Sequence, residues 1–139
     1  MRTAFDHLSV LVIEDEPFTR SVTIRVLEGL GCAPVFGAGD GESGLQLASE
    51  HPIDLVLCDL EMQPLSGLDV LRRLRAAPAR HLQALPVLFV TARFDSEHLA
   101  QASGLGNAAF LAKPIHPQRL HAALIRWYPQ TPAAPSSIP

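Results

Sequence analysis

The 139-residue sequence predicts one α/β domain, in which a five-stranded parallel sheet is covered by helices on both faces. Short runs rich in Val, Leu and Ile occur at residues 8–13, 55–58 and 86–90; each is too short for a helix and ends in polar residues. Weaker candidate strands lie at residues 33–36 and 108–111, and the intervening segments are long enough for helices. The composition agrees, because 47% hydrophobic and only 18% charged residues suit strands that are buried on both faces.

The helix expected between the first two strands has an apolar stripe and a defined end. The stripe consists of Val22, Val26, Leu27 and Leu30. Gly31 follows directly, and glycine is a common residue just beyond the end of a helix. We therefore expect the helix to pack through this stripe and to stop at Gly31.

Two later helices show similar patterns. Ser66 can cap the third expected helix, which is patterned by Leu68, Leu71, Leu74 and Arg75. Pro117 fits the first turn of the last helix, whose stripe is formed by Leu120, Leu124 and Trp127. From Pro129 onward, prolines fall among Thr, Ala and Ser, so we expect a domain over residues 1–128 and a disordered tail or linker over residues 129–139.

Bulk properties exclude several classes of protein. No apolar run approaches the roughly 20 residues that span a bilayer, and the first run leads into acids without a signal-peptide cleavage site. The net charge of −3 offers no basic face for nucleic acid. Cys32 and Cys58 lack metal or disulfide spacing, so we expect buried, reduced thiols. These properties predict a cytoplasmic protein that binds neither membrane nor nucleic acid.

Polar residues that finish the expected strands mark the candidate site. Ligands of parallel α/β sheets bind beyond the carboxyl ends of the strands. Here those ends carry Glu14, Asp15, Asp59, Thr91 and Lys113. The first and third strands are expected to be neighbours, which brings three carboxylates into one crevice.

A divalent cation would offset the repulsion in that crevice. Two carboxylates about 4 Å apart repel by roughly 4 kcal/mol at an effective dielectric constant near 20. An oxygen-only ligand set favours Mg²⁺, which takes one or two carboxylates, retains water and accepts a phosphate oxygen. Lys113 adds a positive charge suited to phosphate, and Thr91 adds a hydroxyl donor.

The order of these residues, with Pro114 directly after Lys113, resembles the receiver domain family of bacterial two-component signalling from residue 8 to about residue 128. The resemblance implies a flavodoxin-like, doubly wound sheet with strand order 2-1-3-4-5 and five helices. It implies that Asp59 accepts a phosphoryl group from phosphohistidine on a histidine kinase or histidine phosphotransfer protein. Such a domain catalyses only its own phosphorylation and dephosphorylation.

The resemblance also assigns roles to the other pocket residues. The implied Mg²⁺ ligands are Asp15, Asp59 and the backbone carbonyl of Glu61, with Glu14 acting through a water. Thr91 and Lys113 would hold the phosphoryl oxygens, with Mg²⁺ and Lys113 neutralising the charge that develops.

A switch is implied as well. Phe110 matches the family's aromatic switch position, and Thr91 would move toward the phosphoryl group while Phe110 turns inward. The family's peptide bond before the proline that matches Pro114 is cis. Output is expected from the face formed by the helix that carries Leu99, the strand at residues 108–111 and the last helix. That face, where two alanines replace a common acidic pair, suits a downstream protein or a second copy of the chain.

Glu61 and Arg93 each lie two residues past a pocket residue and are expected to flank the mouth of the site. The family sets phosphoryl lifetime at these positions. A charge pair there would hinder water, whereas two unlinked surface side chains are the alternative. Gln63 stands where the family usually has proline, and Pro64 follows one residue late, so the loop after the third strand is expected to differ in shape.

Other functions share parts of this pattern. A phosphohydrolase of the haloacid dehalogenase type would use Asp59 as nucleophile and Glu61 as general acid, although its second acidic motif is missing. A receiver fold that no longer signals by phosphate is a second alternative. A flavodoxin-like flavin binder has the same sheet, but Glu14, Asp15 and Glu16 would repel the flavin phosphate.

A glycine motif suggests a dinucleotide site. Gly39, Gly41 and Gly44 match G-x-G-x-x-G after a strand, and Asp59 lies 20 residues past Gly39. Against this, the motif contains two acids of its own, follows the second strand and leaves too little chain for two nucleotide-binding halves. The simpler interpretation is that the glycines form the turn into the second helix.

Overall fold

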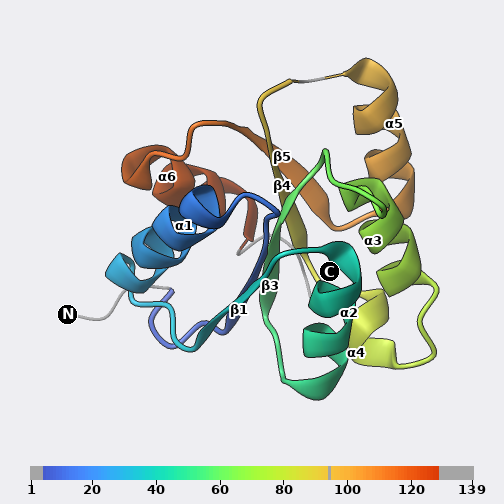
Figure 1. The fold of residues 1–139 in the computed structure, drawn as a ribbon, viewed down its shortest axis with the longest axis horizontal. Coiled ribbons are helices and arrows are strands. Elements are labelled where there is room, and N and C mark those ends of the chain that lie inside the picture. Colours follow the sequence, from blue (N-terminus) through green and yellow to red (C-terminus); the bar gives the residue numbers. More distant parts are fainter. Residues whose placement is uncertain (1–4, 94, 129–139) are drawn as a thin grey trace.

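Five parallel strands form one sheet in the order β2-β1-β3-β4-β5, which confirms the predicted fold class and strand order (Figure 1). A computed structural model describes residues 5–93 and 95–128 of the chain. The strands are β1 (Val10–Ile13), β2 (Val35–Ala38), β3 (Leu55–Asp59), β4 (Val87–Thr91) and β5 (Ala108–Ala112). The predicted tail at residues 129–139 lies outside the described residues.

Six helices accompany the sheet in the described part of the chain, one more than expected. They are α1 (Pro17–Gly29), α2 (Gly41–Glu50), α3 (Gly67–Arg75), α4 (Arg80–Gln83), α5 (Ser96–Leu105) and α6 (Pro117–Trp127). The additional helix, α4, has four residues, which is too short to produce a hydrophobic period along the sequence. Over the described ranges, none of these helices has the length and apolar character needed to cross a membrane.

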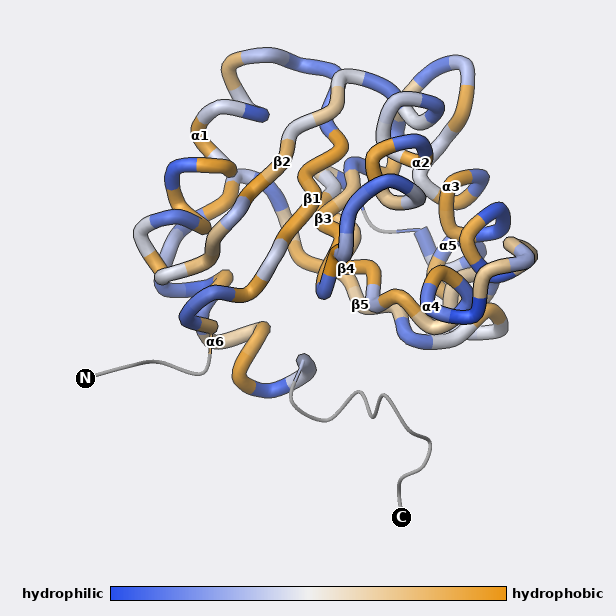
Figure 2. The backbone as a smooth tube through the Cα atoms, turned by 90° about the horizontal axis from the view of Figure 1, so that it is seen from below, coloured by the Kyte–Doolittle hydropathy of each residue, from blue (hydrophilic) through white to orange (hydrophobic). Residues whose placement is uncertain are grey.

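The sheet divides the hydrophobic core into two clusters. Leu11 and Ile13 of β1 belong to the cluster under α2, α3, α4 and α5, whereas Val10 and Val12 belong to the cluster under α1 and α6. This division follows from the alternation of side chains along a strand. Figure 2 shows the apolar strands lying between these two layers of helices. The central strands β1, β3 and β4 are buried along their full length, as a parallel sheet with both faces covered requires.

Helix α1 ends as predicted, but its buried face is different. Leu30 caps the helix, and Gly31 has a φ of +99°, a conformation that favours glycine. Thr23 and Leu27 are buried, whereas Val22 is 36% exposed, so its place in the predicted stripe is wrong. Each helical residue turns about 100° from the last, and burial of Thr23 and Leu27 therefore leaves Val22 beside the exposed Phe18.

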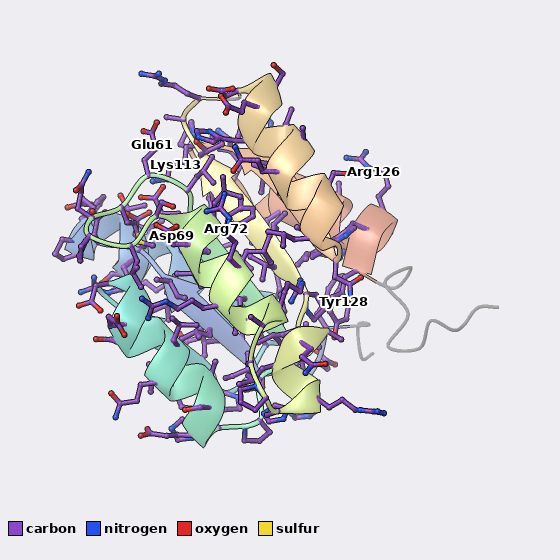
Figure 3. The ribbon with its side chains drawn as sticks, turned by 90° about the vertical axis from the view of Figure 1, so that its right-hand side faces the viewer. Glu61, Asp69, Arg72, Lys113, Arg126 and Tyr128 are labelled. Atoms are coloured by element: carbon purple, nitrogen blue, oxygen red, sulfur yellow. The ribbon has the colours of Figure 1, made fainter. Side chains whose placement is uncertain are left out.

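The predicted start of α3 is confirmed, and its far end is tied to α5. Ser66 and Asp69 form a capping box in which each side chain accepts a backbone N–H of the other residue. The outer face of α3 carries the Asp69–Arg72 ion pair (Figure 3). At the end of α3, Arg75 donates to the carbonyls of Gly106 and Asn107, in the turn between α5 and β5. Burial lowers the pKa of Arg75 to about 10, so it stays charged at neutral pH.

The glycine motif begins α2, as predicted, but for a packing reason. Gly41 is the first residue of α2, and Asp40 caps the helix. A Cβ at Gly44 would lie 2.4 Å from Cδ1 of Ile13, so glycine lets α2 approach the sheet closely. Among the glycines of the described ranges, only Gly31 and Gly106 have positive φ. Gly41 and Gly44 therefore reflect the close packing of α2, and backbone freedom is not their cause.

Candidate functional site

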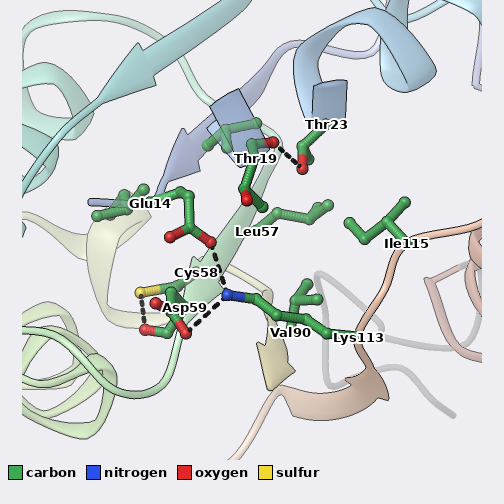
Figure 4. Close-up of a pocket in the computed structure, with 11 residues that line it drawn as sticks. Glu14, Thr19, Thr23, Leu57, Cys58, Asp59, Val90, Lys113 and Ile115 are labelled. Carbon is green, nitrogen blue, oxygen red and sulfur yellow. Dashed lines mark hydrogen bonds and ion pairs between the residues drawn. The ribbon is translucent and has the colours of Figure 1, made fainter. Parts of the chain in front are cut away.

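The predicted pocket residues meet at the carboxyl edge of the sheet. Glu14 and Asp15 follow β1, Asp59 and Thr91 end β3 and β4, and Lys113 follows β5. Figure 4 shows the side chains of Glu14, Asp59 and Lys113 converging from three strands. The Lys113 Nζ lies 2.9 Å from Glu14 Oε1 and 3.4 Å from Asp59 Oδ1. The parallel sheet brings these groups together because all its strands end at the same edge.

Burial strengthens the electrostatic interactions of this group. Glu14 and Asp59 are only 5% and 8% exposed, which is unusual for carboxylates. Burial by itself lowers the pKa of Lys113, but the nearby carboxylates of Glu14 and Asp59 outweigh it, and the net pKa is raised. Lys113 therefore stays protonated and balances part of the buried negative charge.

Glu14, Asp15 and Asp59 each offer a carboxylate oxygen, and these atoms lie within 4.8 Å of one another. The pKa of Asp15 is raised by partial burial and by its contact with Glu14. One lysine cannot neutralise three carboxylates, so a net negative charge remains at this point. The donor set and its excess charge fit Mg²⁺, a hard cation that binds oxygen ligands.

A small cleft, with a volume of about 10 Å³, lies beside these groups. Its polar wall is formed by Glu14, Asp59 and Lys113, and its apolar wall includes Leu57 and Val90. The apolar wall reduces the screening of charges inside the cleft.

Thr91 and Phe110 occupy positions consistent with a switch. Thr91 is buried, and its hydroxyl donates to the Arg93 carbonyl at 2.8 Å and accepts the Arg93 N–H at 3.2 Å. The hydroxyl is therefore engaged by the loop after β4. Phe110 is half-buried, and its ring centroid lies 5.2 Å from that of Phe89. The movements implied for Thr91 and Phe110 stay predictions.

Glu61 and Arg93 are both exposed, and across the described residues no ion pair joins them. Glu61 lies at the same end of the molecule as Lys113 (Figure 3), and its N–H donates to Asp59 Oδ1 at 3.4 Å. The gating role of Glu61 and Arg93 stays a prediction. The peptide bond before Pro114 is cis, as the resemblance implies, and the bond before Pro64 is cis as well.

Sequence reasoning missed Arg20. This residue lies on α1, and its Nη1 donates to the backbone carbonyl of Glu14 at 2.7 Å. No spacing or motif points to this contact, because it joins a helix to the loop that precedes it. The only signal in the sequence is indirect, in the glycines Gly37 and Gly39 that lie beneath the arginine.

Comparisons with known proteins agree with this geometry. Residues 10–125 match the response regulator receiver domain family. A probable chemotaxis protein CheY of Rhizobium etli is 31% identical over 119 residues, which cover 86% of this chain and 91% of that protein. The histidine-protein kinase BarA of Escherichia coli K12 is 30% identical over 122 residues, which cover 88% of this chain but only 13% of BarA.

Solved structures extend the agreement to three dimensions. The receiver domain of the sensor histidine kinase PA1611 from Pseudomonas aeruginosa superposes with a TM-score of 0.76 at 26% identity, covering 88% of this chain and 98% of that one. That structure has a magnesium ion coordinated in its active-site cleft. The family match spans most of the chain, and the pocket residues lie where the resemblance places them. The chain belongs to the response regulator receiver domain family.

Proposed function

We propose that this phosphoacceptor receiver domain of two-component signalling takes its phosphoryl group onto Asp59 and uses Mg²⁺ to do so. The observation that carries the proposal is the contact of buried Asp59 with Lys113 at the end of the central strand β3. Of the three clustered acids, Asp59 alone ends a strand with its own backbone in the sheet. This placement gives the acceptor a fixed position, which phosphoryl transfer requires.

The contacts of the carboxylate oxygens favour Asp59 over Glu14 and Asp15 as the phosphoryl acceptor. Glu14 uses Oε1 for Lys113 and Oε2 for the N–H of Glu16. Asp59 Oδ1 contacts Lys113 and the N–H of Glu61, whereas Oδ2 has no hydrogen-bond or ion-pair partner within the described ranges. Oδ2 is therefore the oxygen available for attack. Asp15 is exposed and lies outside the sheet.

The residues that would hold Mg²⁺ are Asp15, Asp59 and the carbonyl of Glu61, with Glu14 acting through a water. When bound, the ion neutralises charge on the phosphoryl oxygens and on the carboxylates. Lys113 is already protonated and placed to bind a phosphoryl oxygen. Thr91 can reach the phosphoryl group only by releasing the Arg93 carbonyl, which would couple occupancy of Asp59 to the loop after β4.

In the transfer step, Oδ2 of Asp59 forms a bond to phosphorus while the bond between phosphorus and the donor's imidazole nitrogen breaks. The imidazole keeps the electron pair and takes up a proton. Receiver domains interact with histidine kinases and downstream targets, and we infer that the donor here is a histidine kinase or a histidine phosphotransfer protein. We further infer that the domain turns over no external substrate and that a cytoplasmic location suits it.

We infer that output leaves through the face formed by α5, β5 and α6, toward a downstream protein or a second copy. Leu99 on α5 is 38% exposed there, and Ala108 and Ala109 of β5 are half-buried. Partly exposed apolar side chains of this kind suit a protein partner.

Incubation with acetyl phosphate and MgCl₂, followed by intact-protein mass spectrometry, tests the proposal. We expect one added phosphoryl group that requires Mg²⁺ and is absent from Asp59→Asn. Asp54→Asn is a matched control, because it removes a carboxylate at the opposite end of β3. Equal labelling of Asp59→Asn and the parent would refute the assignment, and steady hydrolysis of an external phosphomonoester would favour the phosphohydrolase alternative.

A further inference from the structure

We propose that Arg20 is a positioning residue that fixes the loop between β1 and α1, and that glycines at the end of β2 make room for it. This loop carries Glu14 and Asp15, so the consequence for metal binding rests on the proposed function. The fixing of the loop does not, because it can be measured without metal.

Arg20 completes the hydrogen bonding of Glu14. The N–H of Glu14 donates to the Ala38 carbonyl at 3.0 Å, which extends the pairing of β1 with β2 by one residue. The carbonyl of Glu14 turns to the other side and accepts from Arg20 Nη1 at 2.7 Å. A hydrogen bond from a charged donor is shorter and stronger than one from a neutral donor. The first residue beyond β1 is thus held by β2 on one side and by α1 on the other.

Two glycines, Gly37 and Gly39, line the space that the Arg20 side chain occupies. A Cβ at Gly39 would lie 3.2 Å from Arg20 Nη1, and a Cβ at Gly37 would lie 3.4 Å from Arg20 Cδ and 2.9 Å from Cδ1 of Ile24. Neither Gly37 nor Gly39 has a positive φ, so backbone conformation does not require glycine at either position. The space above them is occupied by the arginine side chain. The first glycine of the G-x-G-x-x-G motif therefore serves the acidic loop.

Charge and position predict opposite effects when Arg20 is replaced. The positively charged side chain of Arg20 contacts the backbone of Glu14, and the side chain of Glu14 belongs to the acid cluster. If only its charge mattered, its removal would strengthen the binding of a cation. If it positions the loop, its removal frees Glu14 and Asp15 to move and weakens the binding of a cation. The sign of the change in Mg²⁺ affinity therefore separates the two roles.

The test uses the full chain as Arg20→Met, Arg20→Lys and Arg25→Met. Arg25 is exposed on the same helix, so Arg25→Met makes the same change of charge without the contact. In metal-free protein, we expect the N–H groups of Glu14 and Glu16 to exchange about tenfold faster in Arg20→Met, the effect of losing a hydrogen bond to a charged group. Calorimetry should show Mg²⁺ dissociation constants raised severalfold in Arg20→Met, partly restored in Arg20→Lys and unchanged in Arg25→Met.

Unchanged exchange together with equal or tighter Mg²⁺ binding in Arg20→Met would overturn the proposal. If the parent itself binds no Mg²⁺, the proposed function fails, and the exchange rates alone decide the role of Arg20. Gly39→Ala tests whether this glycine makes room for the Arg20 side chain. It should accelerate exchange in the parent and add nothing in Arg20→Met, because both changes disturb the same contact. Additive effects would refute the role of Gly39 in making room for Arg20. If Arg20→Met fails to fold, Arg20→Lys and Gly39→Ala still test the proposal.

Discussion

Replacement of Gly67 by alanine should displace the end of β3, where Asp59 lies, without touching a pocket side chain. Gly67 is the first residue of α3, and its N–H donates to the Leu60 carbonyl at 2.8 Å. A Cβ there would lie 2.5 Å from the carbonyl oxygen of Asp59 and 2.9 Å from Cε1 of Phe89. Because ordinary contact begins at 3.4 Å, either the end of β3 or the start of α3 has to move by about 0.9 Å.

A displacement of that size has two measurable consequences. Misplacing reacting groups by about 1 Å costs about 10²-fold in rate, so we expect the initial rate of labelling by acetyl phosphate at saturating Mg²⁺ to fall by about that factor. Overpacking should lower the free energy of unfolding in urea by about 1–3 kcal/mol.

Gly104→Ala in α5 is the control for helix propensity. No atom lies within 4 Å of a Cβ at that position, so this variant should gain about 0.5–1 kcal/mol and label at the parent's rate. Parental labelling and parental stability in Gly67→Ala would show that the close approach of α3 places no constraint on Asp59.

Three further results are expected. A hydrogen bond from the backbone at the start of α3 lowers the pKa of Asp69, so its stabilising effect is present above pH 3.8 and is lost as the pH falls through the folded-state value. Asp69→Asn should therefore cost less than about 1 kcal/mol at pH 7, and should show a smaller loss on acidification than the parent in urea titrations. Arg93→Ala and Glu61→Ala should speed dephosphorylation severalfold by admitting water, and rates equal to the parent's would dismiss gating. Phe110→Ala should uncouple beryllofluoride binding from chemical-shift changes at Leu99; if those changes stay inside the acidic pocket in the parent, the switch prediction fails.

Strand positions were predictable where burial produces an apolar run. They were less predictable where pairing with a neighbouring strand determines the strand's ends. The runs at residues 55–58 and 86–90 nearly coincide with β3 and β4. The second strand, expected at residues 33–36, is Val35–Ala38. Gly37 and Ala38 carry little strand signal, yet they pair with Val12 and Ile13 of β1. Tertiary pairing extends this strand past its apolar residues.

The site was predictable because one rule, that parallel strands end at one edge, gathers residues far apart in the sequence. That rule places Glu14, Asp59 and Lys113 together, but it does not say which atoms pair. The Thr91 hydroxyl bonds the Arg93 backbone, a local contact that competes with any role in the pocket. The Arg20 contact crosses from a helix to the preceding loop, and no periodicity encodes such contacts.

Because the sheet divides the hydrophobic core, the two faces of this domain form separate packing units. The helices α1 and α6 are distant in the sequence but share one hydrophobic cluster, and α2 to α5 share the other. Stability changes at sites without shared partners add, so substitutions packed on opposite faces should combine independently. In a chimaera with another receiver, α1 and α6 therefore form one exchangeable unit, and a cut at a single point in the chain would split it.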